Sequence, residues 1–162
     1  MSHCVTFTRL KSTLTKILYQ MASDYESKTS RHSKICLHRF VDELTAGLLP
    51  RAVSRKSIII NQIDRDLEVG SDENLLAFVL WNLLDKAVDS TQSECIHIES
   101  VQEGDRTMIR VRNAGVYFYG SCATCFRQVQ DAAEKLGGSI SIDSWDMSTT
   151  VALTLHKDLK AA

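Results

Sequence analysis

Proline is nearly absent from the sequence, and charge of neither sign is in excess. Pro50 is the single proline among 162 residues, and 19 Lys and Arg residues balance 20 Asp and Glu residues. This balance provides no electrostatic basis for binding nucleic acid or an anionic membrane. The longest apolar runs, such as LLAFVLW, are far too short to span a bilayer, and the polar start MSHCVTFTRLK lacks the apolar stretch of an export signal. These absences favour a cytoplasmic protein with no membrane segment and no nucleic-acid partner.

Cysteine is present, but in an odd number and without a regular framework. The chain has five cysteines, which is typical of reduced thiols in a reducing compartment. Only Cys122 and Cys125 have C-x-x-C spacing, and a four-ligand zinc site would need a second pair nearby. Chance spacing is the preferred interpretation, and a redox or metal-binding pair is the alternative. Since 44% of the residues are hydrophobic, one domain can bury its core without such links.

Helical periodicity marks the first third of the chain. Residues 7–26 are expected to form an amphipathic helix, and the polar residues 23–34 are expected to connect it to the rest. A second helical pattern covers residues 35–56, where Pro50 is expected to kink or end the helix. The apolar positions of the first helix are Leu10, Leu14, Ile17, Leu18 and Met21. Those of the second are Phe40, Val41, Leu44, Leu48 and Leu49.

Alternating and β-branched runs predict strands in the remainder. SIIINQI is one strand, and CIHIESV and TMIRVRNAG form a pair joined by QEGDR, a hairpin-like turn. DLEVGSDENLLAFVLWNLLDKAV predicts a brief strand, a glycine turn and a long helix whose start Ser71 and Asp72 would cap. FRQVQDAAEKLGG predicts a helix closed by glycine, and SISIDSWDMSTTVALTLH a final hairpin. This order of elements predicts an α+β sandwich. The apolar face of the long helix is expected to consist of Leu75, Leu76, Val79, Leu80, Leu83, Leu84, Ala87 and Val88.

These segments, in this order, resemble the ATP-binding domain of two-component sensor histidine kinases, within the GHKL (HATPase_c, Bergerat-type) ATPase family. DLEVGSDENLLAFVLWNLLDKAVDST resembles the strand and helix that carry the Asn box, and TMIRVRNAG resembles the strand entering the D-x-G-x-G box. LGGSISIDS and STTVALTL resemble the closing elements. The resemblance implies a two-layer α/β sandwich of the GHKL type, with a mixed, mostly antiparallel sheet and helices on one face. It divides the chain into residues 1–32, similar to part of a dimerisation hairpin, and residues 33–162, a histidine-kinase-like ATPase domain.

The resemblance carries the family's nucleotide site onto four positions of this chain. Asn82 matches the Asn that ligates Mg²⁺, a role that an amide oxygen can fill, and an ordinary helix-surface Asn is the alternative. Lys86 replaces the second Asn, and it is interpreted as an exposed helix residue rather than a phosphate contact. Asn113 replaces the Asp that reads the adenine amino group, and losing that charge-assisted bond costs about 1.5–3 kcal/mol. Gly115 matches the first Gly of the box.

The other half of the family's site departs from the pattern. Tyr117 replaces the second Gly of the box, and the glycine-rich lid aligns with residues 122–126, CATCF, which contain no glycine. The aromatic residues 117–119 either fill the vacant adenine pocket or form a surface for a partner. Trp81 and Trp145 are expected in the core or at its rim. The sequence therefore predicts a vestigial site with no catalytic residue, and ATP and Mg²⁺ enter only in the alternative interpretation.

Three functions are compatible with this pattern. The preferred one is a degenerate histidine-kinase-like domain with weak or no ATP binding that contacts a response regulator or a kinase in two-component signal transduction. If the chain is an enzyme, the alternative is an ATP-dependent histidine kinase. The second is a phosphotransfer protein relaying phosphate between receiver domains, for which His32 and His38 are the candidate acceptors. The third is an ATP-binding sensor kinase domain, which rests on Asn82 and Gly115. The apolar stripe of the first helix also needs a partner, and pairing with its own copy would make a homodimer.

Overall fold

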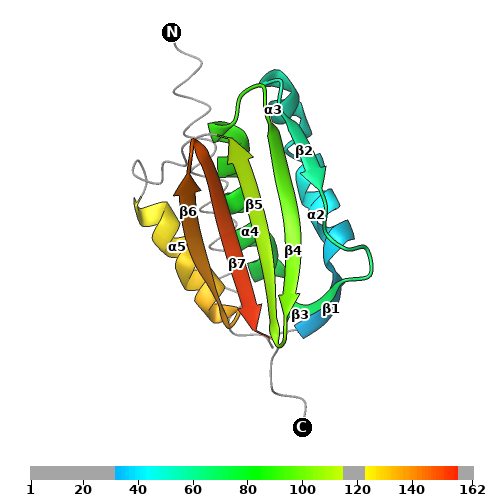
Figure 1. Cartoon of the computed structure of the whole chain (residues 1–162). Coiled ribbons are helices and arrows are strands. Elements are labelled where there is room, and N and C mark those ends of the chain that lie inside the picture. Colours follow the sequence, from blue (N-terminus) through cyan, green and yellow to red (C-terminus); the bar gives the residue numbers. More distant parts are fainter. Residues whose placement is uncertain (1–31, 115–122, 157–162) are drawn as a thin grey trace. The chain divides into compact units, whose positions relative to one another are not determined.

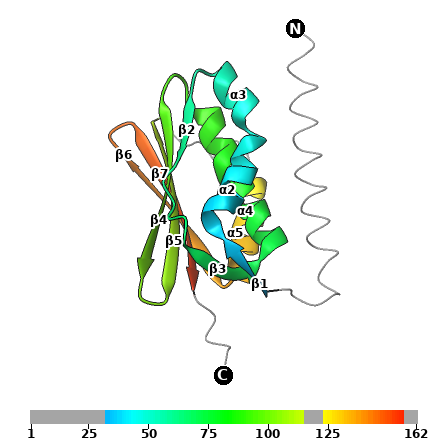
Figure 2. The same cartoon turned by 90° about the vertical axis from the view of Figure 1, so that its right-hand side faces the viewer.

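A five-stranded sheet covered by helices on one face is the framework of the structure (Figure 1, Figure 2). The structure is a computed structural model that describes residues 32–114 and 123–156. The strand order is β2-β4-β5-β7-β6, and only β2 and β4 pair in parallel. The predicted two-layer sandwich with a mostly antiparallel sheet is therefore confirmed. The strands are β2 (Ile58–Asn61), β4 (Cys95–Glu103), β5 (Arg106–Ala114), β6 (Gly138–Trp145) and β7 (Ser148–His156).

The core lies between this sheet and helix α4 (Glu73–Ser90), which contacts β5 and its neighbouring helices. The predicted apolar face is buried except for Leu75, which is half-buried, and Phe78 is a further buried residue that the predicted stripe omits. Every second residue of the central strands faces the helices, because side chains alternate along a strand. The buried residues of β4, β5 and β7 that meet the helices include Ile96, Ile98, Ile109, Val111, Val151 and Leu153.

The start of α4 is fixed by one of the two predicted caps. The Asp72 carboxylate accepts hydrogen bonds from the backbone N–H groups of Asn74 and Leu75, each at 3.0 Å. Ser71 is not a cap, since it is a buried residue of β3 (Glu68–Asp72). Asp72 is therefore both the last residue of a strand and the N-cap of the helix that follows.

The single helix predicted over residues 35–56 is in fact two helices, α2 (Leu37–Ala46) and α3 (Leu49–Ser54). The break falls at residues 47–48, and Pro50 lies in the first turn of α3. Proline is accommodated there because the first N–H groups of a helix have no partner within the helix. Pro50 therefore begins a helix instead of kinking or ending one.

The residue that follows the first of these helices is tightly packed. Gly47 lies against the ring of Trp81, and a Cβ atom at Gly47 would be 3.1 Å from two ring carbons. Trp81 is half-buried, as expected for a residue at the rim of the core. Of the predicted stripe, Val41 and Leu48 are buried, whereas Leu49 is exposed because it belongs to the second helix.

A separate two-stranded antiparallel sheet pairs β1 (His32–Cys36) with β3. Two expectations are wrong here. Residues 32–34, expected in a connector, belong to strand β1, and Gly70, expected in a turn, lies inside strand β3. The polar sequence HSK lacks the alternation of a half-buried strand, and pairing with a distant segment makes it extended. Lys34 donates a hydrogen bond of 2.9 Å to Glu68 across this sheet, and this contact raises the pKa of Lys34.

The last helix and the last hairpin agree with the prediction from the sequence except at two points. Helix α5 (Ala123–Lys135) begins three residues before the predicted Phe126, and Gly137 follows it with a φ of +71°, which glycine adopts at little cost. The β6–β7 turn places Asp146 and Met147 at positive φ. Trp145, expected in or beside the core, is 84% exposed in this hairpin. In the part of the chain that the structure describes, no helix is long and apolar enough to cross a membrane.

Candidate functional site

The C-terminal half of α4 and the end of β5 carry three of the four predicted site residues. Asn82 and Lys86 lie one turn apart on α4, and Asn113 is the second-last residue of β5. Gly115 lies outside the described residues, as do Tyr117, Phe118 and Tyr119. Most of the stretch aligned with the family's lid, residues 123–126, forms the first turn of α5.

Asn113 is almost completely buried, and its amide joins the strand to the last turn of α4. Its side chain faces the helices, with the residue only 1% exposed. Its Nδ2 donates a hydrogen bond to Ser90 Oγ at 3.1 Å and a long one to the Ala114 carbonyl at 3.5 Å. Its Oδ1 is buried, and no donor among the described residues reaches it. Most buried polar atoms in proteins are hydrogen-bonded, so this oxygen is an unusual free acceptor.

The amide nitrogen of Asn82 is also hydrogen-bonded within the protein. Its Nδ2 donates to the Phe78 carbonyl one turn earlier on α4, at 2.7 Å. The side chain is half-buried, and its Oδ1 is the atom that remains suited to a metal ion. The predicted role as a Mg²⁺ ligand therefore depends on this single amide oxygen.

The residues around Asn82 fit a magnesium ion poorly. Lys86, half-buried and not exposed as expected, adds a positive charge one turn along the helix. Within the described ranges, no group of three or more His, Cys, Asp and Glu side chains is arranged to hold a metal ion. The carboxylates of Asp85 and Asp89, on the same helix, interact with Arg51. In the described part of the chain, a hard divalent cation would thus find no carboxylate cluster beside Asn82 and a lysine one turn away, so we derive no chemistry through a metal.

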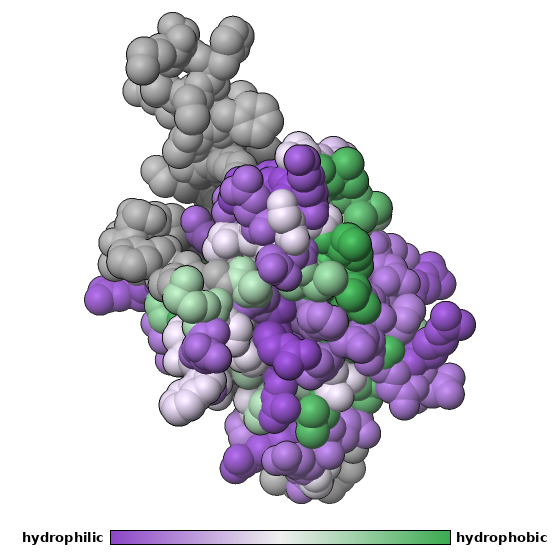
Figure 3. Space-filling view, turned by 45° about the horizontal axis from the view of Figure 1, so that its top comes forward, coloured by the Kyte–Doolittle hydropathy of each residue, from purple (hydrophilic) through white to green (hydrophobic). Residues whose placement is uncertain are grey.

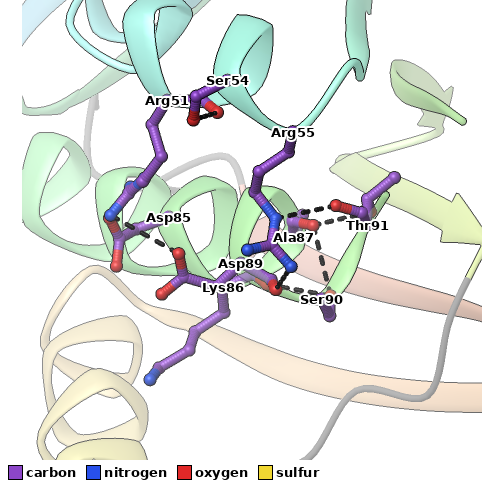
Figure 4. Close-up of polar contacts among 9 residues, drawn as sticks. All are labelled: Arg51, Ser54, Arg55, Asp85, Lys86, Ala87, Asp89, Ser90 and Thr91. Atoms are coloured by element: carbon purple, nitrogen blue, oxygen red, sulfur yellow. Dashed lines mark hydrogen bonds and ion pairs between the residues drawn. The ribbon is translucent and has the colours of Figure 1, made fainter. Parts of the chain in front are cut away.

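Two arginines from the α3 region hold the C-terminal end of α4 (Figure 4). Arg51 forms an ion pair with Asp85, and its Nη1 lies 3.6 Å from Asp89 Oδ1. Arg55 donates from Nε to the Thr91 carbonyl at 2.9 Å and from Nη2 to the Asp89 carbonyl at 2.6 Å. The last turn of α4 has no basic residue of its own, so these guanidinium groups supply the positive charge that stabilises a helix C-terminus.

The sequence-based prediction missed this cluster and the serine beside it. Ser90 Oγ lies 2.9 Å from the Lys86 carbonyl and 3.2 Å from the Ala87 carbonyl, and it also accepts the bond from Asn113. Two signals were available, namely the i,i+4 spacing of Arg51 and Arg55 and the i,i+4 spacing of the two acidic residues on α4. No comparable signal marks Ser90, because its role follows from the three-dimensional position of a strand residue.

The two candidate phosphate-accepting histidines lie in different environments. His32 is the first residue of β1, so it does not lie on a helix. His38 lies on α2, and its partly buried ring has Nδ1 3.3 Å from the carboxylate of Asp42. The packed position expected for His38 agrees with this geometry, whereas a phosphate-accepting histidine needs a freely exposed ring.

Comparisons with known proteins identify the fold. No protein-family model matches the sequence, and no curated protein matches it. Among solved structures, the histidine kinase AdeS of Acinetobacter baumannii matches with a TM-score of 0.75 and 11% identity, over 90% of this chain and 77% of that chain. The catalytic domain of histidine kinase ThkA, in a nucleotide-free form, matches with a TM-score of 0.67 and 17% identity, over 78% of this chain and 96% of that one.

A third match is ThkA in complex with the response regulator protein TrrA. It has a TM-score of 0.71 and 16% identity, and it covers 96% of this chain and 50% of that chain. At these identities the similarity establishes the fold, which is that of the catalytic, ATP-binding domain of histidine kinases.

Proposed function

We propose that this chain, which has the fold of a histidine kinase catalytic domain, acts in two-component signal transduction through contacts with protein partners and binds ATP weakly or not at all. The observation that carries this proposal is Asn113. The family's charged acceptor for the adenine amino group is replaced by a neutral amide whose nitrogen is bonded to Ser90. A charge-assisted hydrogen bond in a buried site contributes about 1.5–3 kcal/mol, so its loss weakens binding about ten- to hundredfold.

The exposed apolar residues support the protein-contact part of the proposal. Leu49 and Val53 lie one turn apart on α3, and Ile58 begins the adjacent strand β2. Val53 is 70% exposed and Ile58 61% exposed. In the space-filling view, hydrophobic side chains gather along one side of an otherwise hydrophilic face (Figure 3). Clustered exposed apolar side chains are a common feature of protein-binding surfaces.

The partner we propose is a response regulator or a histidine kinase. A solved structure with this fold is a kinase bound to a response regulator. We further propose that the chain acts in the cytoplasm and forms a homodimer through the apolar stripe of residues 7–26, which lie outside the described residues.

Nucleotide binding is tested by thermal unfolding with Mg-ATP. We expect millimolar Mg-ATP to raise the melting temperature by no more than about a degree, whereas a ligand at a hundred times its dissociation constant stabilises by about 2.7 kcal/mol. A large increase that disappears in Asn82→Ala would overturn the proposal, because that result requires a working nucleotide site.

Partner binding is tested with receiver domains from response regulators of the same organism. We expect one of them to bind at micromolar concentration, and Val53→Glu to weaken that binding at least about tenfold, because a buried unpaired charge at an interface is costly. Gln102→Glu introduces the same charge at an exposed position of β4 and serves as the control. Failure of every receiver and kinase to bind would remove the protein-contact proposal.

One observation favours a sensor kinase domain that binds ATP as the second candidate function. The Asn113 Oδ1 atom is a buried acceptor with no donor in the described part of the chain, as a site for an amino group would require. The phosphotransfer alternative receives less support, since His32 lies in a strand and His38 faces Asp42.

A further inference from the structure

The orientation of the Asn113 amide is determined by Ser90. A serine hydroxyl has one proton to donate, and that of Ser90 is directed to carbonyls of its own helix, Lys86 at 2.9 Å and Ala87 at 3.2 Å. Toward Asn113, Ser90 Oγ therefore presents a lone pair. Only the amide nitrogen can bond to a lone pair, and Nδ2 lies 3.1 Å away.

This orientation decides which atom of Asn113 is left for a ligand. With Nδ2 bonded to Ser90, the free atom is Oδ1, which is buried and has no donor among the described residues. A carboxylate would present an acceptor in either orientation, whereas an amide presents an acceptor in one and a donor in the other. This chain has Asn in place of Asp. Whether its side chain presents an acceptor or a donor to a ligand therefore depends on the neighbouring residue that fixes the orientation of the amide.

We infer that Ser90 is a specificity-determining residue: by fixing the Asn113 amide, it makes the buried group an acceptor that takes a 6-aminopurine nucleotide and rejects a 6-oxopurine nucleotide. The 6-amino group donates hydrogen bonds to Oδ1, while a 6-oxo group places a second acceptor against it. Ser90 acts by positioning Asn113. The inference rests on the weak nucleotide binding that the proposed function allows.

The end of α4 holds Ser90 in place for this role. Arg55 bonds the carbonyls of the residues on either side of Ser90, Asp89 and Thr91. The Thr91 hydroxyl donates to the Ala87 carbonyl at 2.7 Å. The turn that contains Ser90 is therefore fixed from two directions, and the lone pair facing Asn113 has a defined position.

The test compares ATP with inosine triphosphate, in which a 6-oxo group replaces the 6-amino group of the purine. We expect the full chain to bind Mg-ATP at least about tenfold more tightly than Mg-ITP by calorimetric titration at millimolar concentrations. In Ser90→Ala the amide is free to turn, and the ratio should fall to within about threefold. Thr45→Val is the control and should leave the ratio unchanged, because it removes a buried residue's hydroxyl that bonds a carbonyl of its own helix, α2, and not the turn that holds Ser90.

The possible results of this experiment test the inference and the proposed function separately. Equal affinity for both nucleotides in the wild-type chain, or an unchanged ratio in Ser90→Ala, overturns the inference. Binding of neither nucleotide also overturns it and leaves the proposed function intact. Tight ATP binding with the expected ratios supports the inference and overturns the proposed function.

A second variant covers the case in which Ser90→Ala does not fold. Ser90→Thr keeps the hydroxyl and should keep the preference for ATP, with the Asn113 side-chain amide protons exchanging slowly in NMR spectra. Rapid exchange of those protons in the wild-type chain would show that Ser90 does not hold the amide, and would overturn the inference.

Discussion

At the scale of single residues, the end of helix α4 depends on arginines supplied by another segment. Arg55 donates to two main-chain carbonyls of the last turn, and Arg51 pairs with Asp85. The four last carbonyls of a helix have no partner inside it, and leaving them unpaired in a partly buried position is unfavourable. These contacts stabilise the turn from which Ser90 reaches Asn113.

Replacing Arg55 tests this role. We expect Arg55→Ala to lower the free energy of unfolding by about 1.5–3 kcal/mol, because two charged hydrogen bonds to the α4 terminus are lost. Urea unfolding followed by circular dichroism measures the change. Arg39→Ala, which removes only an exposed pair with Glu43, should change the stability by no more than about 0.5 kcal/mol. Equal effects of the two substitutions would contradict the capping role.

Individual site residues were predictable to different degrees. The motif pattern identified Asn82, Lys86 and Asn113, and the structure places Asn82 and Lys86 in the C-terminal half of α4 and Asn113 near the end of β5. Their hydrogen bonds were not predictable, since the burial of Asn113 and its bond to Ser90 depend on how a strand and a helix pack. The exposure of Trp145 was unpredictable for a related reason, because a hairpin tip has the same residue types as a strand.

At the scale of elements, local chemistry predicted the helix boundaries that short-range signals mark, namely the start of α4 and the glycine end of α5. The acidic cap of α4 was identified from sequence, because its effect depends only on the next three residues. The sequence predicts one helix across α2 and α3, since apolar spacing continues over the gap, and the close approach of Gly47 to Trp81 is a tertiary contact with no signal in the sequence. The sequence predicts a connector where strand β1 lies, because the extended form of this segment depends on pairing with β3.

The Asp72 cap gives an element-scale prediction. We expect Asp72→Ala to lower the free energy of unfolding by about 0.5–2 kcal/mol, because two N–H groups of the first turn of α4 lose their acceptor. Asp72→Ser keeps an acceptor and should retain most of the stability in the same urea titration. A loss as large in the serine variant would indicate that the carboxylate acts in another way.

Two glycines in strands give a matched pair of substitutions. At Gly138, the first residue of β6, an added Cβ would overlap the Thr154 carbonyl oxygen of the neighbouring strand. We therefore expect Gly138→Ala to destabilise the domain by about 1–3 kcal/mol, as overpacking does. At Gly70 in β3 an added Cβ meets no atom within 4 Å, and Gly70→Ala should leave stability unchanged or raise it by up to about 1 kcal/mol. Thermal unfolding of both variants compares the two sites.

At the scale of the whole molecule, the α+β class was predictable because it follows from periodicity, and the resemblance to histidine kinases implied the mixed, mostly antiparallel sheet. The alternation in β4, β5 and β7 and the wide apolar face of α4 specify one sheet face and one helix layer. The binding partner was not predictable, because hydrophobic periodicity identifies buried faces and exposed apolar residues such as Val53 do not belong to such a pattern. Fold and function are thus separate conclusions for this chain.

Assembly is the prediction that belongs to this scale. The apolar stripe of residues 7–26 predicts a homodimer at tens of micromolar in sedimentation velocity experiments, since an isolated amphipathic helix is marginal in water. The double substitution Leu14→Glu and Leu18→Glu should give a monomer, and Lys11→Glu on the polar side should not. A wild-type chain that sediments only as a monomer would contradict this expectation.

The exposed ring of Trp145 can serve as an intrinsic fluorescence probe. Its indole is open to water at the β6–β7 turn, whereas that of Trp81, the other tryptophan of the chain, is partly shielded beside Gly47. Emission from the two rings should differ in wavelength, and a dissolved quencher should reach Trp145 first. With Trp81 changed to Phe, a single fluorophore would remain, and a blue shift on adding a partner would locate the contact at that turn without any attached dye.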